Sequence, residues 1–324
     1  MNYEKLITYS QEIYANQHSI YISDEKIQAL SAEITDKNAE NWDWELPEAL
    51  RIGNVEQENA FDIAHYWFLT TAIQFCYWTK VDGEFSHWCY LGDPDLKGSS
   101  GMARMMQDFY IVEDSKGNSE KNPCFPSINN NSALVYARFS SLFRMAGIPK
   151  AEERADILST LSNAKKFKQL FDESYDAIND IYTFDTAMAY RIGEMYPAAY
   201  KDVFLKKAQL LLAMLAANFR ARGWKVQSEL TVPADYRLSQ VLRHLGIFEY
   251  SISFAEMVDS QSFVKPNGDA EKAIRAATIV ACHELAKAAD VTEEVVDAFL
   301  FMKTREDDFM KMADPFHLCI TTNY

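Results

Sequence analysis

The sequence predicts an all-α fold, arranged as one compact domain over residues 1–324, and three observations indicate it. Glycine and proline are scarce, at 11 and 9 of 324 residues, whereas a strand-rich fold needs many turns. Hydrophobic residues make up 48% of the chain, which is typical of a globular protein with a large core. Apolar residues also recur at helical spacing along most of the chain, between the usual helix start and stop signals.

The first 58 residues are expected to form short amphipathic helices that pack on the body of the protein. The segment from Ser23 to Lys26 has the composition of a helix start, and apolar residues at helical spacing follow it as far as Ile34. Residues 41–47 then form an aromatic and acidic connection. Residues 58–78 are apolar on nearly every face, which predicts a central buried helix.

Residues 80–100 contain turn signals such as Asp82-Gly83, which predict a small hairpin or an irregular insertion. A methionine-rich helix is expected over residues 101–110. The most polar stretch, residues 113–131, is predicted to be an exposed loop. Further helices are predicted over residues 132–146, two or three within 150–196, and then 198–222, 234–246, 250–263, 269–289 and 292–312. The C-terminal residues 314–324 are apolar enough to dock on the body as a strand.

The net charge excludes one broad class of partner. The chain carries 47 acidic and 32 basic residues, a formal net charge of −15. Duplex nucleic acid is normally bound through an excess of lysine and arginine, so a surface this acidic repels it. A small basic pocket for a single phosphate is still compatible with this charge. The expected partner is therefore a small molecule, a nucleotide or nucleoside, and not duplex nucleic acid.

Cysteine usage and hydropathy indicate a cytoplasmic protein. The five cysteines are scattered and form no CxxC pair, which predicts reduced thiols rather than disulfides or a zinc site. No metal or other cofactor is expected. The N-terminus lacks the pattern of a signal peptide, and no apolar run approaches the length of a membrane span, so no membrane association is expected. The sequence does not indicate an oligomeric state.

The helix that follows Pro233 and ends at Gly246 has the clearest local signals in the chain. It begins with Asp235, Tyr236 and Arg237, which bring a carboxylate, a phenol and a guanidinium together in succession. The simplest interpretation of Asp235 is an N-cap whose carboxylate accepts hydrogen bonds from the first turn of the helix. Capping does not exclude catalysis, because the same hydrogen bonds orient a carboxylate.

No common catalytic motif is present: the chain has no glycine-rich nucleotide loop, zinc-protease motif, serine-hydrolase elbow or kinase motif. Cys282, His283 and Glu284 are adjacent in sequence. Consecutive residues of a helix point in different directions, however, so these three do not form a ready-made dyad. The ordinary interpretation is a helix with a buried thiol and a flanking acidic residue.

Several segments resemble the queuosine salvage protein family. They are residues 206–213, residues 234–246 and Pro315-Phe-His317, and residues 74–78 are similar to an Asn-Phe-x-Phe-Trp segment of that family. The likeness runs from roughly residue 60 to the end, and the Ala-Asp-Tyr-Arg-Leu helix start is its most specific part. Family members are queuosine 5'-phosphate N-glycosylases, which hydrolyse the nucleotide and release queuine.

The resemblance implies a helical fold related to the helical base-excision DNA glycosylases, without their duplex-binding role. It also implies that Asp235 is catalytic. Three positions depart from the family pattern: Thr71 and Met302 stand where the family has aspartates, and Pro233 stands where it has an aromatic residue. The hydrolytic carboxylate is therefore kept, while the residues expected to recognise the base have changed.

The leading hypothesis is hydrolysis of the N-glycosidic bond of a modified nucleoside 5'-monophosphate, releasing queuine or a related base for salvage. Positive charge develops on the ribose as the base leaves, and Asp235 would stabilise that charge or attack C1'. Aromatic residues would stack on the base, basic residues would meet a 5'-phosphate, and other polar side chains would bind ribose or base. The expected substrate-binding residues are Tyr236, Trp67, Phe75, Trp78 and Phe301; Arg237, Lys207 or Lys303 for the phosphate; and His317 or Glu306 for ribose or base.

Two other functions remain open from the sequence. The missing aspartates suggest a binding protein or re-purposed paralogue that holds a nucleobase-like ligand without hydrolysing it. A weaker alternative is removal of flipped bases from DNA, of the DNA glycosylase type. The net charge of −15 argues against the second.

Overall fold

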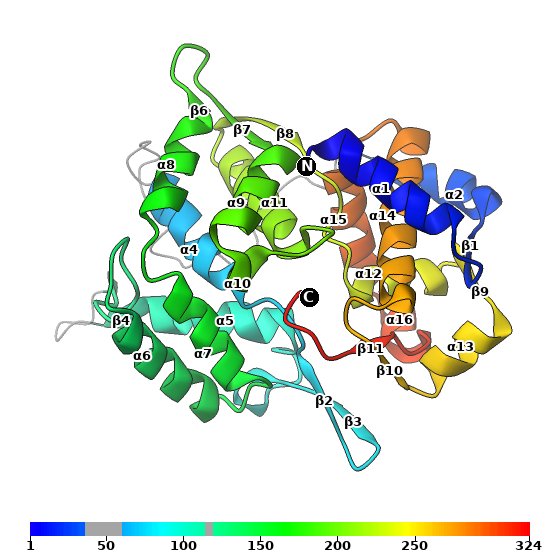
Figure 1. Ribbon diagram of the computed structural model, residues 1–324, viewed down its shortest axis with the longest axis horizontal. Coiled ribbons are helices and arrows are strands. Elements are labelled where there is room, and N and C mark those ends of the chain that lie inside the picture. The colour runs from blue at the N-terminus through cyan, green and yellow to red at the C-terminus, as the bar shows by residue number, and fades with distance from the viewer. Residues whose placement is uncertain (36–59, 114–118) are drawn as a thin grey trace.

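The computed structural model describes residues 1–35, 60–113 and 119–324. Helices occupy 57% of these described residues and strands 13%, so the all-α prediction is wrong and the fold is a helix-rich mixture of α and β. Within the described ranges, the strands form four sheets of two strands and one of three. These sheets lie at the edges of a helical body and between its helices (Figure 1).

The helices make up most of the molecule (Figure 1). In chain order they are α1 (Tyr3–Ala15), α2 (Asp24–Ser31), α4 (Ala60–Ala72), α5 (Ser99–Tyr110), α6 (Ser132–Met145), α7 (Ala151–Thr160), α8 (Lys165–Glu173), α9 (Thr186–Met195), α10 (Pro197–Tyr200), α11 (Lys206–Ala221), α12 (Tyr236–His244), α13 (Ile252–Asp259), α14 (Asp269–Ala289), α15 (Glu293–Lys303) and α16 (Asp307–Met312), with a 3₁₀ turn at Tyr90–Gly92.

The strands are short and mostly pair antiparallel. They are β1 (Ile20–Ile22) with β9 (Phe248–Tyr250), β2 (Trp78–Val81) with β3 (Glu84–His87), β4 (Ile111–Glu113) with β5 (Ser119–Lys121), β6 (Tyr175–Asp176) with β7 (Ile181–Asp185), and the parallel pairs β7 with β8 (Lys225–Glu229) and β10 (Phe263–Val264) with β11 (Leu318–Cys319).

The three-stranded sheet explains why the fold class was mispredicted. Two or three helices were expected within residues 150–196, and α7, α8 and α9 confirm them, but an unexpected hairpin of β6 and β7 lies between α8 and α9. β7 then pairs in parallel with β8, in the register Ile181 opposite Lys225. Partners this far apart in the sequence are joined by helices α9 to α11, and no local periodicity reveals such pairing. The strands were missed because tertiary contacts form them.

Most of the helices follow the predicted local signals. Ser23 caps α2 by accepting a hydrogen bond from the Lys26 N–H, and α14 spans the predicted residues 269–289. The insertion at 80–100 contains the β2–β3 hairpin, which turns at Asp82-Gly83. The C-terminal strand is also confirmed, as β11.

Two segments with predictions in the N-terminal half lie wholly or partly outside the described residues. The aromatic connection at 41–47 lies outside the described residues. Of the predicted loop at 113–131, the structure describes the short strand β5 and the turns after it. In the N-terminal segment, α1 and α2 pack against α14, as the prediction of a segment docked on the body requires.

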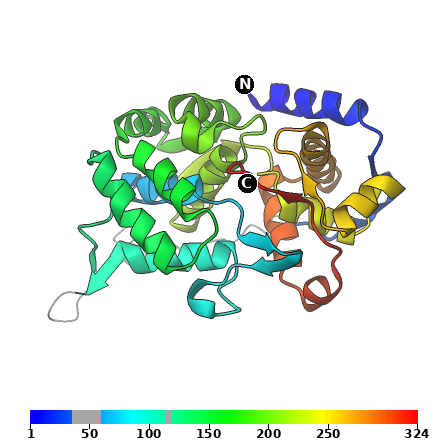
Figure 2. The ribbon, with the colours of Figure 1, turned by 60° about the horizontal axis from the view of Figure 1, so that its bottom comes forward.

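The elements form two groups with the C-terminal segment between them (Figure 1). One group contains α4 to α11 and the other contains α1, α2 and α12 to α16. A continuous cluster of buried hydrophobic side chains joins both groups, from Leu6 to Tyr324. Trp78 of β2 contacts Phe263 and Phe316, so the hairpin lies beside the C-terminal segment (Figure 2). The middle of the molecule is therefore built from segments that are far apart in the sequence.

Candidate active site

A cavity of about 360 Å³ lies where these two groups of elements meet. Its walls come from α4 and the loop after it, the segment from β3 into α5, the start of α11, the start of α12, α15 and the C-terminal residue. The lining residues are Trp67, Thr71, Gln74, Phe75, Tyr77, His87, Pro94, Asp95, Lys97, Gly98, Ser99, Ser100, Lys206, Leu210, Met214, Pro233, Asp235, Tyr236, Arg237, Leu238, Asp297, Phe301, Thr304, Arg305 and Tyr324.

Asp235 lies at the N-terminus of α12, where the sequence predicts it. Its Oδ1 accepts hydrogen bonds from the backbone N–H groups of Arg237 at 2.8 Å and Leu238 at 3.1 Å, so the capping interpretation is confirmed. Because Oδ1 is held in this way, Oδ2 is the oxygen available to the cavity. The side chain is 26% exposed. Asp235 is therefore a capping residue and a cavity residue at once.

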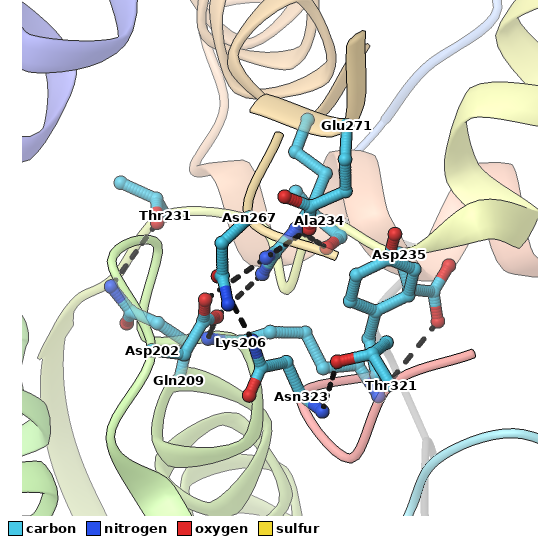
Figure 3. Close-up of polar contacts among 12 residues, drawn as sticks. Asp202, Lys206, Gln209, Thr231, Ala234, Asp235, Asn267, Glu271, Thr321 and Asn323 are labelled. Carbon is cyan, nitrogen blue, oxygen red and sulfur yellow. Dashed lines mark hydrogen bonds and ion pairs between the residues drawn. The ribbon is translucent and has the colours of Figure 1, made fainter. Parts of the chain in front are cut away.

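Lys206 places a positive charge beside this carboxylate. Its Nζ lies 3.9 Å from Asp235 Oδ2 (Figure 3). The same Nζ donates a hydrogen bond to the Gln74 carbonyl at 3.3 Å. Burial lowers the pKa of Lys206, and the negative charge of Asp235 opposes that effect. The capping N–H groups and this lysine thus surround the Asp235 carboxylate with hydrogen-bond donors and positive charge.

A buried ion pair holds the two helix starts in place. Arg275 of α14 pairs with Asp202 and Glu271, and its side chain is wholly inaccessible. Asp202 Oδ2 accepts a hydrogen bond from the Lys206 N–H at 2.9 Å, and Arg275 Nε donates to the Ala234 carbonyl at 3.1 Å. Figure 3 shows Asp202, Glu271 and Ala234 converging on this point. The pair thus fixes the chain just before Asp235 and at the first turn of α11.

A second buried arginine, Arg154, holds the lining segment that follows α4. Arg154 of α7 donates to the carbonyl oxygens of Ile73, Phe75 and Cys76 in the loop that follows α4. Its guanidinium also lies 4.2 Å from the centre of the Phe75 ring. The predicted helix over 58–78 therefore ends at Ala72, because the following carbonyl groups bond to Arg154 and not to a further helical turn.

Asp297 is a cavity residue that the sequence reasoning missed. It lies on α15, is buried, and lines the cavity together with Asp235 and Lys206. Burial, with the negative charge of Asp235 adding to it, raises the pKa of Asp297 to about 8. One signal was available in the sequence: Asp297 is the acidic residue in an otherwise apolar run, 295–302. Burying a carboxyl in such a run costs free energy, so its presence there indicates a functional role.

The aromatic residues of the cavity come from three elements. Trp67, Phe75, Tyr236 and Phe301 line it, as expected of substrate-binding residues, and Tyr77 adds a further ring. Tyr236 is held by stacking on Phe316, with ring centres 4.4 Å apart. The cavity therefore offers flat apolar surfaces beside a charged cluster.

Positive side chains also line the cavity. Lys97, Arg237 and Arg305 all line it, and Arg305 donates a hydrogen bond to the Ser100 hydroxyl at 3.2 Å. Burial, with the charges of Lys97 and Arg237 adding to it, lowers the pKa of His87 to about 3, so His87 is neutral there. Asp95 contributes an opposing but exposed charge.

Five of the residues expected to bind substrate do not line this cavity. Trp78 packs in the aromatic contacts between β2 and the C-terminal segment. Lys207 is buried and donates to the Ala72 carbonyl at 2.8 Å. Lys303 pairs with Glu306 at 3.2 Å and with Glu33 at 3.5 Å, away from the cavity.

His317, the fifth, is a buried structural residue. It lies between the Ser239 hydroxyl at 3.3 Å and the Tyr324 hydroxyl at 3.1 Å, and burial lowers its pKa to about 3. It acts on the site through Tyr324, which itself lines the cavity. His317 therefore supports the cavity wall from behind.

Of the three positions that depart from the resembled family, Pro233 and Thr71 line the cavity and Met302 does not. Thr71 lines the cavity, and its hydroxyl donates to the Trp67 carbonyl at 2.7 Å. Met302 is 55% exposed and does not line the cavity. The helix that carries Met302 nevertheless brings Asp297 into the cavity.

The described residues contain neither a candidate metal site nor a membrane-spanning helix. Across the described ranges, no group of three or more histidine, cysteine, aspartate or glutamate side chains is arranged to hold a metal ion. None of the helices in those ranges is both long enough and apolar enough to cross a membrane.

Comparison with known proteins covers the whole cavity. A family model described as queuosine salvage protein matches residues 54–324, which include every lining residue. A queuosine 5'-phosphate N-glycosylase/hydrolase of Sphaerobacter thermophilus is 25% identical over 251 residues, or 73% of each chain. A protein of the same name from Dictyostelium discoideum is 24% identical over 229 residues, which cover 67% of this chain and 63% of that protein.

Proposed function

The chain belongs to the queuosine salvage protein family, and we propose that it hydrolyses the N-glycosidic bond of a modified nucleoside 5'-monophosphate, releasing queuine or a related base. Both curated relatives are named as hydrolases of queuosine 5'-phosphate. The observation that carries the proposal is Asp235, a carboxylate oriented by two backbone N–H groups with its second oxygen available to an aromatic-lined cavity.

Asp235 meets the main demand of this reaction. As the bond between C1' and the base nitrogen breaks, positive charge develops on the ribose ring. A fixed carboxylate beside C1' stabilises that charge, and it needs no reorganisation because the helix start already holds it. The carboxylate either acts electrostatically while water attacks or bonds to C1' itself. In both cases the Lys206 Nζ lies beside the carboxylate, 3.9 Å from Asp235 Oδ2.

The aromatic residues of the cavity suit a flat heterocyclic base. Trp67, Phe75, Tyr77 and Phe301 supply rings and ring edges, and Gln74 adds an amide. A volume of about 360 Å³ is at the small end of the range for ligand pockets, which is roughly 300–1,000 Å³. A single nucleotide fits that range, whereas a duplex does not.

The basic residues of the cavity suit the 5'-phosphate. Lys97, Arg237 and Arg305 supply positive charge, and the hydroxyls of Ser99 and Ser100 supply hydrogen bonds. Charge-assisted hydrogen bonds of this kind are the strong ones. The phosphate is thus assigned to Arg237 and its neighbours in the cavity, and not to Lys207 or Lys303, which lie outside it.

The experiment is incubation of the purified protein with a panel of ordinary and modified nucleoside 5'-monophosphates, including queuosine 5'-phosphate. Free base is measured by mass spectrometry. The proposal expects base and ribose 5-phosphate in equal amounts from at least one modified nucleotide. Binding of a nucleotide with no base released in a long incubation would contradict the proposal and support a binding protein instead.

A further inference from the structure

The carboxyl of Asp297 lines the cavity together with Asp235 and Lys206, and the mechanism above does not use it. The residue is 6% exposed and lines the cavity. No residue of the described ranges hydrogen-bonds or ion-pairs with its side chain, whereas Asp235 and Lys206 both have partners. A buried carboxyl without a partner is costly, so a group that reaches a cavity in this state is placed to meet a ligand.

The surroundings of Asp297 favour its neutral form. Asp235 at the start of α12 and Glu294 on its own helix place negative charges near it, and the Lys206 ammonium on α11 opposes them. Cys282, on α14, faces it as a neutral thiol, since burial raises the pKa of Cys282 well above its usual value. Because the pKa of Asp297 lies at about 8, the side chain is mostly protonated at neutral pH.

The cavity thus holds two carboxyl groups in opposite surroundings. The Asp235 carboxylate accepts two hydrogen bonds from backbone N–H groups and faces the Lys206 side chain. Asp297 has no such contacts and keeps its proton. Pairs of carboxyl groups whose surroundings separate their protonation states divide the roles of charge stabiliser and acid between them.

We propose that Asp297 is the general acid of the reaction, donating its carboxyl proton to a nitrogen of the departing base. This inference rests on the proposed function, because it needs a base to leave. Proton transfer of this kind contributes roughly 100- to 10,000-fold to the rate. Without it, the base leaves as an anion inside a cavity that already holds the charge of Asp235.

The proton and electron balance is complete without a cofactor. The electron pair of the bond from C1' to nitrogen goes to the base, and the Asp297 proton joins the base, so the base leaves neutral. The oxygen of a water molecule bonds to C1', and that water loses a proton to solvent. Asp297, left as a carboxylate, takes up a proton from solvent before the next turnover.

A leaving-group comparison separates acid catalysis from simple binding. Wild type and Asp297→Asn are assayed on the nucleotide that the wild type cleaves fastest and on 4-nitrophenyl β-ribofuranoside 5-phosphate. Nitrophenolate leaves without a proton, so a missing acid affects only the nucleotide. We expect Asp297→Asn to lower kcat at least roughly 100-fold on the nucleotide and less than about fivefold on the nitrophenyl substrate.

The pH profile gives a second, independent readout. For the wild type, kcat on the nucleotide falls above about pH 8, and this alkaline decline is absent on the nitrophenyl substrate. Equal losses of kcat on both substrates in Asp297→Asn would overturn the acid role and leave the hydrolase intact. A wild type that cleaves neither substrate would instead overturn the proposed function, and the inference with it.

Discussion

Arg275 and Asp202 form an ion pair inside the protein, with Arg275 Nη1 2.9 Å from Asp202 Oδ1. The two side chains are 0% and 2% exposed. The pair also controls the site, because Asp202 accepts from the Lys206 N–H and Arg275 donates to the carbonyl just before Asp235. A single buried contact therefore sets the distance between the lysine and the carboxylate in the cavity.

Removing one charge of this pair should destabilise the protein strongly. In Asp202→Asn the Arg275 guanidinium loses its main partner, and breaking a buried pair in this way costs about 3–5 kcal/mol. The measurement is the free energy of unfolding in urea. Glu173→Gln is the control, because Glu173 pairs with Arg191 at the surface, with both side chains about half exposed, and such pairs contribute less than about 1 kcal/mol. Equal unfolding midpoints for the two variants would contradict this account.

The neutral state of Asp297 should be visible in stability as a function of pH. The pKa of Asp297 is about 8 in the folded protein and 3.8 as a free side chain, so the unfolded chain loses this proton first as the pH rises. Stability contributed by the neutral carboxyl is therefore present below about pH 4 and is lost as the pH rises through 8.

Asp297→Asn, which does not titrate, should consequently gain stability over the wild type as the pH rises. We expect a gain of at least about 1 kcal/mol at pH 8 relative to pH 5, measured as thermal midpoints and converted to free energy. Asp156→Asn, at an exposed position of α7, is the control and should show no such dependence. A constant difference between Asp297→Asn and wild type across this pH range would show that Asp297 is ionised when folded.

The basic residues that line the cavity should lower KM for substrates that carry a 5'-phosphate. Lys97→Met should raise KM for a nucleoside 5'-monophosphate by roughly 10-fold or more, because a hydrogen bond to a charged group contributes about 1.5–3 kcal/mol. KM for the matching nucleoside should stay the same. Lys303→Met makes the same chemical change outside the cavity, where Lys303 pairs with Glu306, and should alter neither value. A parallel rise of KM for nucleotide and nucleoside in Lys97→Met would place the phosphate elsewhere.

Local signals in the sequence were sufficient to locate most of the helices and to place Asp235 at the start of one of them. The start of α12 could be located because Pro233, a capping carboxylate and a terminal glycine all act within one short segment. The strands could not be predicted in this way. β7 and β8 are partners only because α9 to α11 return the chain to the same place, and that depends on packing rather than on pattern.

The sequence also does not indicate which side of each helix faces the cavity. Lys206 and Lys207 are neighbours, and the sequence does not indicate which of them faces the cavity. In the structure Lys206 reaches Asp235, whereas Lys207 turns back to the carbonyl of Ala72. The same limit concealed Asp297, because only the packing of α15 against α12 brings its side chain into the cavity.

The central claim is that the Asp235 carboxylate drives base release, and Asp235→Asn tests it most directly. Asparagine caps a helix about as well as aspartate, so the fold and the start of α12 should persist. Asp185→Asn is the matched control: Asp185 caps α9 by accepting from the Met188 N–H at 2.7 Å, and it does not line the cavity.

The measurement is the rate of base release, at saturating substrate, from the nucleotide that the wild type cleaves fastest. Thermal unfolding midpoints are measured alongside to check that the variants are as stable as the wild type. The account predicts that Asp235→Asn loses at least roughly 100-fold in kcat, because the charge beside C1' is gone, while Asp185→Asn retains the wild-type rate. Full turnover by Asp235→Asn would contradict it.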